Sequence, residues 1–207
     1  MADVQLRTYC FLDSMQPQFA SLEASTAQGF LPVTGQAALY VEVAPGMAVQ
    51  RLLDVACKAT AVMPGTLVVE RAFGLMEVHH DNQGEVQQAG AAVLSALGLK
   101  EAQRVKPRVT TSTIIRKVTD YHTMLINRSR RGQMLLGGQT LYILEVEPAA
   151  YVTLAANEAE KASHVNLLEL RGVGAFGRLF LGGDEADVVV AAEAAEAAIK
   201  AVTGAEK

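Results

Sequence analysis

The chain contains no tryptophan, few aromatic residues, and only two cysteines among its 207 residues. Cys10 and Cys57 are too far apart in the sequence to form the knuckle of a metal site. Two cysteines without a pattern, in a chain with no recognisable signal peptide, are typical of reduced thiols in a cytoplasmic protein. We therefore expect neither a disulfide framework nor a metal site.

Long apolar runs are also missing. No stretch approaches the roughly 18 uninterrupted apolar residues of a membrane span, and the apolar tail Val188–Val202 is interrupted by Glu193, Glu196 and Lys200. The net charge is −4, with acidic and basic residues interspersed, so no global field attracts nucleic acid or an anionic membrane. We expect neither of these partners.

Motifs for metal-dependent or nucleophilic catalysis are absent from the sequence. It contains neither H-E-x-x-H nor the G-x-S-x-G nucleophile elbow, and no Ser/His/Asp set recurs. The histidines, which we interpret as surface or turn residues, are His79, His80, His122 and His164. We predict no catalytic residue, no bound metal and no cofactor, and hence a protein that is not an enzyme.

What the sequence does contain is a long internal repeat. Gly35-Gln36 returns as Gly138-Gln139, and Ala72-Phe73-Gly74 returns as Ala175-Phe176-Gly177, in both cases 103 residues later. Solenoid units repeat every 20–50 residues or so, so this spacing indicates a duplicated domain. The apolar fraction of 50% and the mean hydropathy of +0.20 are somewhat high, which is consistent with surfaces that are buried in an oligomer.

The first copy mixes strand and helix patterns. Leu52, Val55, Ala56 and Ala59 follow the i, i+3, i+4, i+7 spacing of an amphipathic helix. The elements we predict are a strand at Val4–Leu12, a short helix from a cap at Asp13-Ser14 to about Ala27, a strand at Ala37–Val43, a helix that begins at Pro45, strands at Thr66–Glu70 and Leu75–Val78, and a helix from Asn82 to about Leu97.

The second copy repeats this order after a basic linker, Gly98–Pro107. The elements we predict are strand Val109–Ile115, helix Asp120–Arg131, strand Thr140–Val146, helix Ala149–Ala162, strands Val165–Leu170 and Arg178–Leu181, and helix Asp187–Val202. This order predicts an α/β (α+β) fold with two domains, 1–104 and 105–207, each of about four strands and three helices.

The segment Gly172–Gly177 matches the dinucleotide fingerprint G-x-G-x-x-G. That chemistry requires a strand before the glycines and a helix directly after them, so that helix amides meet the pyrophosphate. The following residues, Arg178–Gly183, instead have the pattern of a strand that ends in a turn. We therefore interpret the glycines as a bend between two strands that approaches another backbone closely.

The corresponding loop of the first copy comprises Glu70, Arg71, Ala72, Phe73 and Gly74. In a monomer, such a loop is a solvated turn whose charge pair contributes little to stability. On a symmetry axis, copies of Glu70 and Arg71 would converge in a ring that closes by pairing between subunits or opens. The function of this loop therefore depends on assembly.

Two further groups of charged residues have alternative interpretations. Lys58 and Lys161 occupy equivalent positions of the repeat, which favours a shared role at an edge, although a lone lysine is normally solvated. Arg128, Arg130 and Arg131 precede Gly132, as is typical of a capped helix end. The alternative for the arginines is a patch that attracts anions.

The doubled order of elements resembles the bacterial microcompartment shell domain in its tandem, trimer-forming version. Each copy begins with the strand and helix that usually end this domain, so the chain resembles the circularly permuted form. The stretches that are most similar to carboxysome members of the family are Val69–His79, Asn82–Val86, Leu125–Arg128, Arg131–Leu136, Leu154–Ala162 and Phe176–Leu179. The likeness covers nearly the whole chain.

This resemblance implies a shell tile that associates with other shell proteins. Members of this type form homotrimers whose six domains mimic a hexagon, and in the permuted branch two trimers stack. Glu70 and Arg71 fall on the family's pore-gating pair, and Lys58 and Lys161 on its edge lysine. The second copy departs from the pattern, because Val173 and Gly174 stand where the gating pair would be.

We therefore expect a structural shell protein of a cytoplasmic microcompartment, a carboxysome. Its pseudo-hexagonal trimer would pass small phosphorylated metabolites through a gated pore. The alternative is a regulatory module that binds metabolites at an anion site near Arg128–Arg131.

Overall fold

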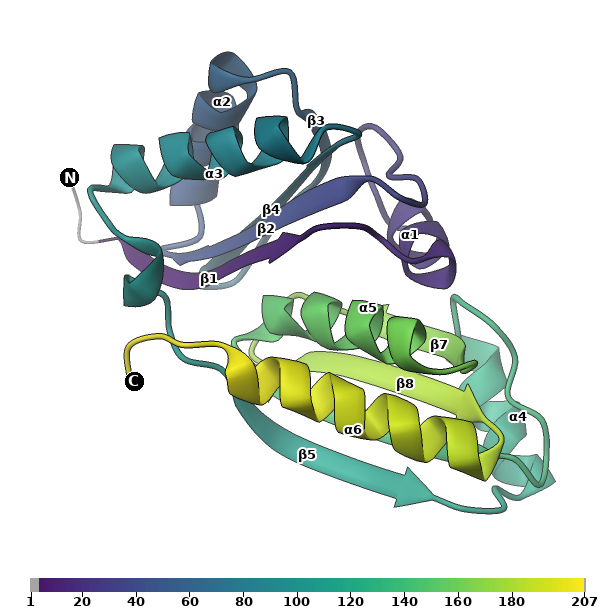
Figure 1. Cartoon of the computed structure of the whole chain (residues 1–207). Coiled ribbons are helices and arrows are strands. Elements are labelled where there is room, and N and C mark those ends of the chain that lie inside the picture. Colours follow the sequence, from purple (N-terminus) through teal and green to yellow (C-terminus); the bar gives the residue numbers. More distant parts are fainter. Residues whose placement is uncertain (1–3, 207) are drawn as a thin grey trace. The chain divides into compact units, whose positions relative to one another are not determined.

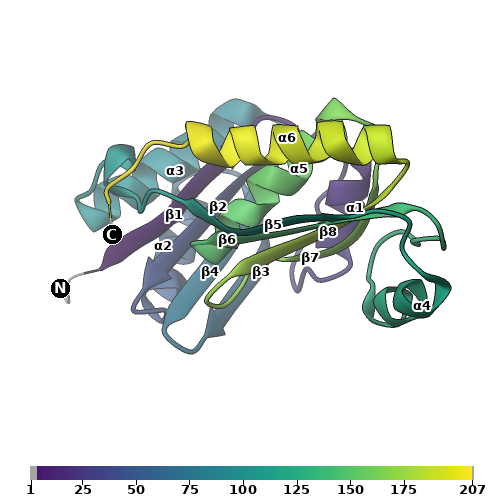
Figure 2. The same cartoon turned by 90° about the horizontal axis from the view of Figure 1, so that it is seen from below.

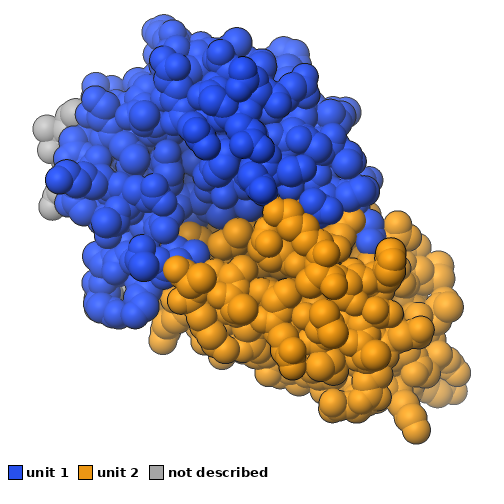
Figure 3. All heavy atoms as spheres, in the orientation of Figure 1, with its two compact units in different colours: residues 1–106, 202–207 blue, residues 107–201 orange. Residues whose placement is uncertain are grey.

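The computed structural model describes residues 4–206, which divide into two compact units (Figure 3). Unit 1 contains the described residues up to Lys106 together with those from Val202 onward, and unit 2 is Pro107–Ala201. The tail belongs to unit 1 because Lys106 N donates to Ala205 O at 2.9 Å and Arg104 Nε donates to Thr203 O at 2.9 Å. The sequence placed the boundary at 104/105, so the compact units differ from it chiefly in this tail.

Unit 1 follows the element order that the sequence predicts (Figure 1). Its elements are β1 (Gln5–Leu12), α1 (Pro17–Ala24), β2 (Ala37–Ala44), α2 (Ala48–Ala59), β3 (Met63–Glu70), β4 (Phe73–His80), α3 (Gln83–Leu97) and the 3₁₀ turn η1 (Glu101–Gln103). Asn82 caps α3 by accepting a hydrogen bond from Gly84 N at 2.8 Å, and Gly98 ends it in the left-handed conformation.

Unit 2 repeats the series. Its elements are β5 (Arg108–Ile115), α4 (Asp120–Ser129), β6 (Thr140–Glu147), the 3₁₀ turn η2 (Ala149–Tyr151), α5 (Val152–Ala162), β7 (Asn166–Arg171), β8 (Gly177–Gly183) and α6 (Glu185–Ala201). Helices α5 and α6 lie side by side over one face of the sheet, as both cartoon views show (Figures 1 and 2). The predicted α/β class and the two tandem domains are confirmed.

Both units contain an antiparallel four-stranded sheet with the same topology. The strand orders are β1-β2-β4-β3 and β5-β6-β8-β7. Even the irregularities repeat: the register shifts between Leu6 and Thr8 and between Pro64 and Thr66, and it shifts at the equivalent positions of unit 2. The duplication therefore extends to the bulges, which re-aim single side chains.

The core of unit 1 lies between its sheet and the pair α2 and α3. Alternate residues of β2 and β4 face these helices, among them Leu39, Val41 and Met76. At Gly90 of α3 an added Cβ would collide with the Tyr9 hydroxyl, so helix and sheet are in close contact there. Helix α1 packs on the opposite face, where the rings of Phe19 and Tyr40 meet edge to face with their centres 6.4 Å apart.

Two predicted helix starts are wrong. Helix α1 begins at Pro17, because proline suits the first helical position, and not at a cap formed by Asp13-Ser14. The helix expected from Pro45 begins at Ala48, after a turn in which Ala48 N donates to Pro45 O at 3.1 Å. In unit 2 the turn η2 likewise delays α5 to Val152.

Candidate functional site

The loop Glu70–Gly74 is the tip of the hairpin formed by β3 and β4. Glu70 and Phe73 are the last register pair, so only Arg71 and Ala72 turn the chain, and both are exposed. Arg71 has a φ of 54°, a value that is uncommon outside glycine. The hairpin therefore presents a guanidinium at its tip, next to the half-buried Glu70.

A buried ion pair supports this hairpin at Phe73. Arg7 Nε donates to Glu42 Oε1 at 2.6 Å, and both side chains are almost completely buried. The guanidinium carbon of Arg7 lies 3.6 Å from the centre of the Phe73 ring, which is cation–π geometry. Arg7 was not among the predicted site residues. The signal that could have identified it is the presence of one charged residue in each of two apolar strands, Arg7 in Val4–Leu12 and Glu42 in Ala37–Val43.

The backbone comes unusually close at Gly74. A Cβ at Gly74 would overlap Gly46 O, and a Cβ at Gly46 would lie 2.7 Å from Phe73 C. The hairpin is thus held against the turn that precedes α2, and neither glycine tolerates a side chain without movement.

The equivalent hairpin of unit 2 is built differently. Its last register pair is Arg171 and Arg178, so the connection Gly172–Gly177 is wider, and Gly174 supplies a φ of 102°. No helix follows the glycines, because β8 begins at Gly177, and a Cβ at Gly177 would overlap Ala149 O. The bend and its close backbone approach are confirmed, and the geometry for a dinucleotide is missing from this segment.

The predicted edge lysines occupy matching places, in the last turns of α2 and α5. Lys58 Nζ lies 2.7 Å from Asp54 Oδ2, and Lys161 Nζ lies 2.9 Å from Glu158 Oε1. Both positions favour cations because of the helix dipole. The contact with neighbouring tiles stays a prediction.

The arginine cluster lies at the end of α4. The helix expected to reach Arg131 ends at Ser129, so Arg128 is in its last turn and Arg130 is the C-cap residue. Arg130 Nη1 donates to Gly132 O at 2.9 Å, whereas Arg128 and Arg131 are exposed. This arrangement favours the interpretation as a helix end over the anion site.

A histidine expected at the surface is buried. His79 is completely buried in β4, where its Nδ1 lies 2.9 Å from Glu77 Oε1, so the interpretation as a surface residue is wrong for His79. Cys10 is buried and Cys57 exposed, and neither is joined in a disulfide. In residues 4–206 no three His, Cys, Asp or Glu side chains are grouped as a metal site requires.

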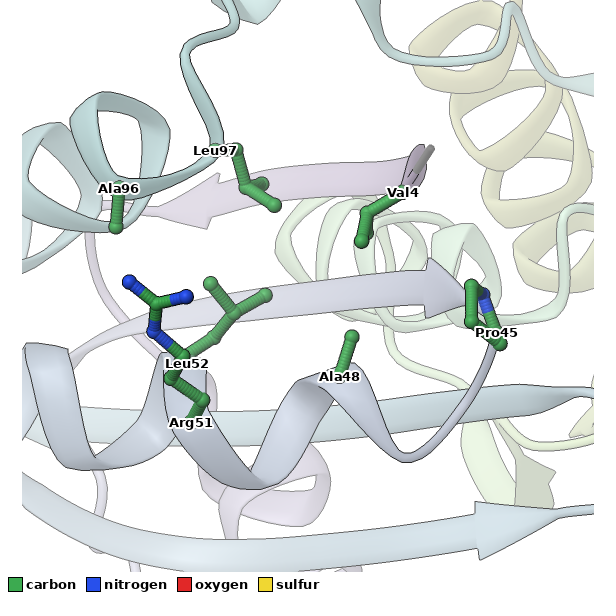
Figure 4. Close-up of a pocket in the computed structure, with 7 residues that line it drawn as sticks. All are labelled: Val4, Pro45, Ala48, Arg51, Leu52, Ala96 and Leu97. Carbon is green, nitrogen blue, oxygen red and sulfur yellow. The ribbon is translucent and has the colours of Figure 1, made fainter. Parts of the chain in front are cut away.

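Unit 1 also contains an apolar pocket of about 280 Å³ (Figure 4). Its lining residues are Val4, Pro45, Ala48, Arg51, Leu52, Ala96 and Leu97. In unit 2 the positions of Ala48 and Ala96 are taken by Tyr151 and Ile199, both buried. The pocket therefore lies where unit 2 has two larger side chains.

No helix in the described part of the chain is long and apolar enough to cross a membrane.

Comparison with known sequences gives consistent results. The family described as the CsoS1D N-terminal domain matches residues 6–103. The carboxysome shell protein CcmP of Synechococcus elongatus is 53% identical, over 98% of this chain and 95% of its own length. The carboxysome shell protein CsoS1D of Hydrogenovibrio crunogenus is 52% identical, over 97% of this chain and 98% of its own.

Solved structures agree over the same extent. The fused permuted hexameric shell protein MSM0275 of the RMM microcompartment has a TM-score of 0.94 and 44% identity, over 97% of this chain and 99% of its own. The double ringed trimeric shell protein MSM0271 of the same microcompartment has a TM-score of 0.95 and 38% identity, over 99% of this chain and 100% of its own.

Proposed function

Because the chain belongs to the family of tandem, circularly permuted microcompartment shell proteins that includes CcmP and CsoS1D, we propose that it forms pseudo-hexagonal homotrimers in a carboxysome shell and that the Glu70–Gly74 hairpin of unit 1 lines a gated pore. The structural shell role follows from the family. The names of the relatives support the compartment and the trimer. Small phosphorylated metabolites are the solutes we assign to the pore.

The observation that carries the pore is the construction of the unit 1 hairpin. Two residues turn the chain, Gly74 fixes its base against Gly46, and Phe73 lies on the buried Arg7. The exposed Arg71 and its neighbour Glu70 are therefore presented from a supported backbone. Unit 2 has Val173 and Gly174 at the equivalent positions. A trimer would consequently place three charged and three uncharged hairpin tips around its axis.

A charge pair between neighbouring subunits gives a simple gate. In the closed state, Arg71 of one protomer pairs with Glu70 of the next, and in the open state each side chain is solvated. Exposed pairs contribute only about 0–1 kcal/mol each. A solute that binds one state slightly better therefore shifts the balance between them.

Stacking of two trimers has its own candidate surface, in unit 2. Exposed apolar side chains gather on α4 and on the segment after it: Tyr121, Met124, Leu125, Met134 and Leu136. The segment lies against α4, because Asn127 Nδ2 donates to Leu135 O at 2.7 Å. A second copy of the chain is the occupant we assign to this surface, and the double ringed relative supports it.

The gate is tested with a double substitution, Glu70→Ala with Arg71→Ala. We expect trimers that assemble normally and whose axis is open in crystal or electron microscopy structures. Tyr121→Ser with Leu125→Ser is the matched control, since it should halve the solution mass from six chains to three without changing the axis. An axis that is still sealed in the Glu70/Arg71 variant would exclude this charge pair as the gate.

A further inference from the structure

Unit 1 contains a network of ionisable side chains beneath α1 that the pore does not use. Tyr40 Oη donates to Glu23 Oε2 at 3.0 Å, which links α1 to β2. Tyr40 faces Glu77 as its register partner in β4, and Glu77 contacts His79. Tyr40, Glu77 and His79 are completely or almost completely buried, and Glu23 is half-buried. We call Glu23, Tyr40, Glu77 and His79 the Glu23 network.

The repeat shows that the fold does not require ionisable groups at this place. The positions of Glu23, Tyr40, Glu77 and His79 are occupied in unit 2 by Ile126, Ile143, Phe180 and Gly182. Three of these, Ile126, Ile143 and Phe180, pack against an apolar cluster that includes Leu168. Unit 1 therefore has ionisable groups where the same sheet and helix in unit 2 are held together by apolar contact.

The backbone of β3 is adapted to the Glu77 carboxylate. Leu168 of unit 2 corresponds to Gly65, and a Cβ at Gly65 would overlap Glu77 Oε2. The amides of Gly65 and Thr66, at the bulge of β3, donate hydrogen bonds to this carboxylate. The carbonyl of Gly65 accepts hydrogen bonds from Gln28 N and Gly29 N, both at 2.9 Å. One bulge thus contacts both the network and the segment that follows α1.

Two carboxyl groups share this space with few positive partners. The groups that act on Glu23 are Glu77 and Tyr40, and Cys10 of β1 acts on Tyr40. Burial, followed by the nearby Glu77, raises the pKa of Glu23 to about 7, although the Tyr40 hydrogen bond opposes the shift. Burial likewise raises the pKa of Glu77, against the hydrogen bonds from His79 and the backbone. His79 Nε2 is buried and has no hydrogen-bond partner among the described residues.

We propose that the Glu23 network is a proton-controlled contact: protonated Glu23 keeps α1 docked on the sheet of unit 1, and ionised Glu23, facing Glu77, releases α1 together with the segment 25–36. That segment carries the exposed side chains Phe30, Leu31 and Val33. Its release would change the apolar surface that unit 1 offers to other copies of the chain.

The sign of the pH effect follows from the raised pKa. Glu23 binds its proton more tightly in the docked state than in the open state, where its pKa returns to about 4.5. Docking of α1 is therefore strongest below about pH 4.5. Between this pH and about pH 7, the equilibrium constant for opening rises by about tenfold for each pH unit. Above about pH 7, ionisation is complete and no further weakening is expected.

Hydrogen exchange of the assembled full-length protein, corrected for intrinsic rates, tests the proposal. Protection of α1 amides should fall by about tenfold per pH unit between about pH 5 and 7 and then level off. Amides of α4 serve as the internal control and should show no such change. In Glu23→Gln, which keeps the hydrogen-bond acceptor for Tyr40 but cannot ionise, α1 protection should not depend on pH.

A second variant separates the roles of the two carboxyl groups. Glu77→Gln removes the facing charge, so the pKa of Glu23 in the docked state should fall. The loss of α1 protection should then level off at a lower pH and be smaller in total than in the unmodified protein. The proposal is overturned if α1 protection in the unmodified protein does not depend on pH, or if Glu23→Gln keeps the dependence. Neither result bears on the pore, because the readout is confined to α1.

Discussion

The guanidinium carbon of Arg7 lies over the Phe73 ring, 3.6 Å from its centre, while Arg7 Nε donates to the buried Glu42. Phe73 is the first residue of β4 after the hairpin tip. A charge pair in the interior of unit 1 therefore supports the proposed pore hairpin at the point where β4 leaves its tip. Unit 2 replaces Arg7 with Thr110 and pairs Glu145 with the more exposed Arg178 at 2.7 Å.

Arg7→Met should destabilise unit 1 by about 3–5 kcal/mol, because it leaves the buried Glu42 carboxylate without its cation. Chemical denaturation monitored in unit 1 measures the loss. Arg7→Met with Glu42→Leu should recover most of it, since no buried charge remains. Arg178→Met is the matched control in unit 2, where the partly exposed pair contributes about 0–1 kcal/mol. Equal losses for Arg7→Met and Arg178→Met would contradict the role given to burial.

Gly74→Ala and Gly177→Ala should each destabilise their unit by about 1–3 kcal/mol, because the new Cβ overlaps a backbone carbonyl, Gly46 O or Ala149 O. Gly172→Ala is the control. Its Cβ would meet its nearest atom at 3.5 Å, so a change within about 0.5 kcal/mol is expected. Thermal unfolding distinguishes the three. A neutral Gly74→Ala would mean that the hairpin can move away from the α2 turn.

Arg71→Gly should change the free energy of unfolding by less than about 1 kcal/mol. Arg71 already has a φ of 54°, and glycine adopts that conformation without the strain that a Cβ causes. Unit 2 has glycine at this position. The substitution removes the guanidinium while keeping the tip geometry. Calorimetric unfolding is the measurement, and a loss above about 2 kcal/mol would show that Arg71 makes contacts that hold the hairpin together.

Ala96→Ile should stabilise unit 1 by about 0.5–2 kcal/mol by filling part of the 280 Å³ pocket with the residue that unit 2 uses at that place. Ala91→Ile on the exposed side of α3 controls for the lower helix propensity of isoleucine. The comparison is made by urea titration. If both substitutions lower the free energy of unfolding by the same amount, side chains added at Ala96 do not enter the pocket.

The elements were predictable from the sequence because each has a local signal. The helical spacing of apolar residues, the helix start at Asn82 and the repeat itself predict the order of elements in both copies. The local signals failed where two of them competed. Asp13-Ser14 and Pro17 both signal a helix start, and the helix begins at Pro17. They also failed at the turn after Pro45, whose hydrogen bonds join residues three apart and delay the helix.

The site residues were only partly predictable, for a different physical reason. The loop Glu70–Gly74 was found through the repeat and the family resemblance. The roles of Arg7 and the buried His79 were not found from the sequence. Arg7 meets its partner Glu42 on another strand, and His79 is buried because its strand pairs with a strand on each side. A charged residue within an apolar strand was the one signal available, and it does not say which partner the residue meets.

The position of the unit 1 hairpin in the assembled particle tests the central claim most directly. A cryo-electron microscopy reconstruction of the purified protein should show three chains around one axis, or six in two rings, with the three Arg71 side chains nearest to that axis. Hairpins at the outer rim of the disc, or a particle that contains one chain, would contradict the account.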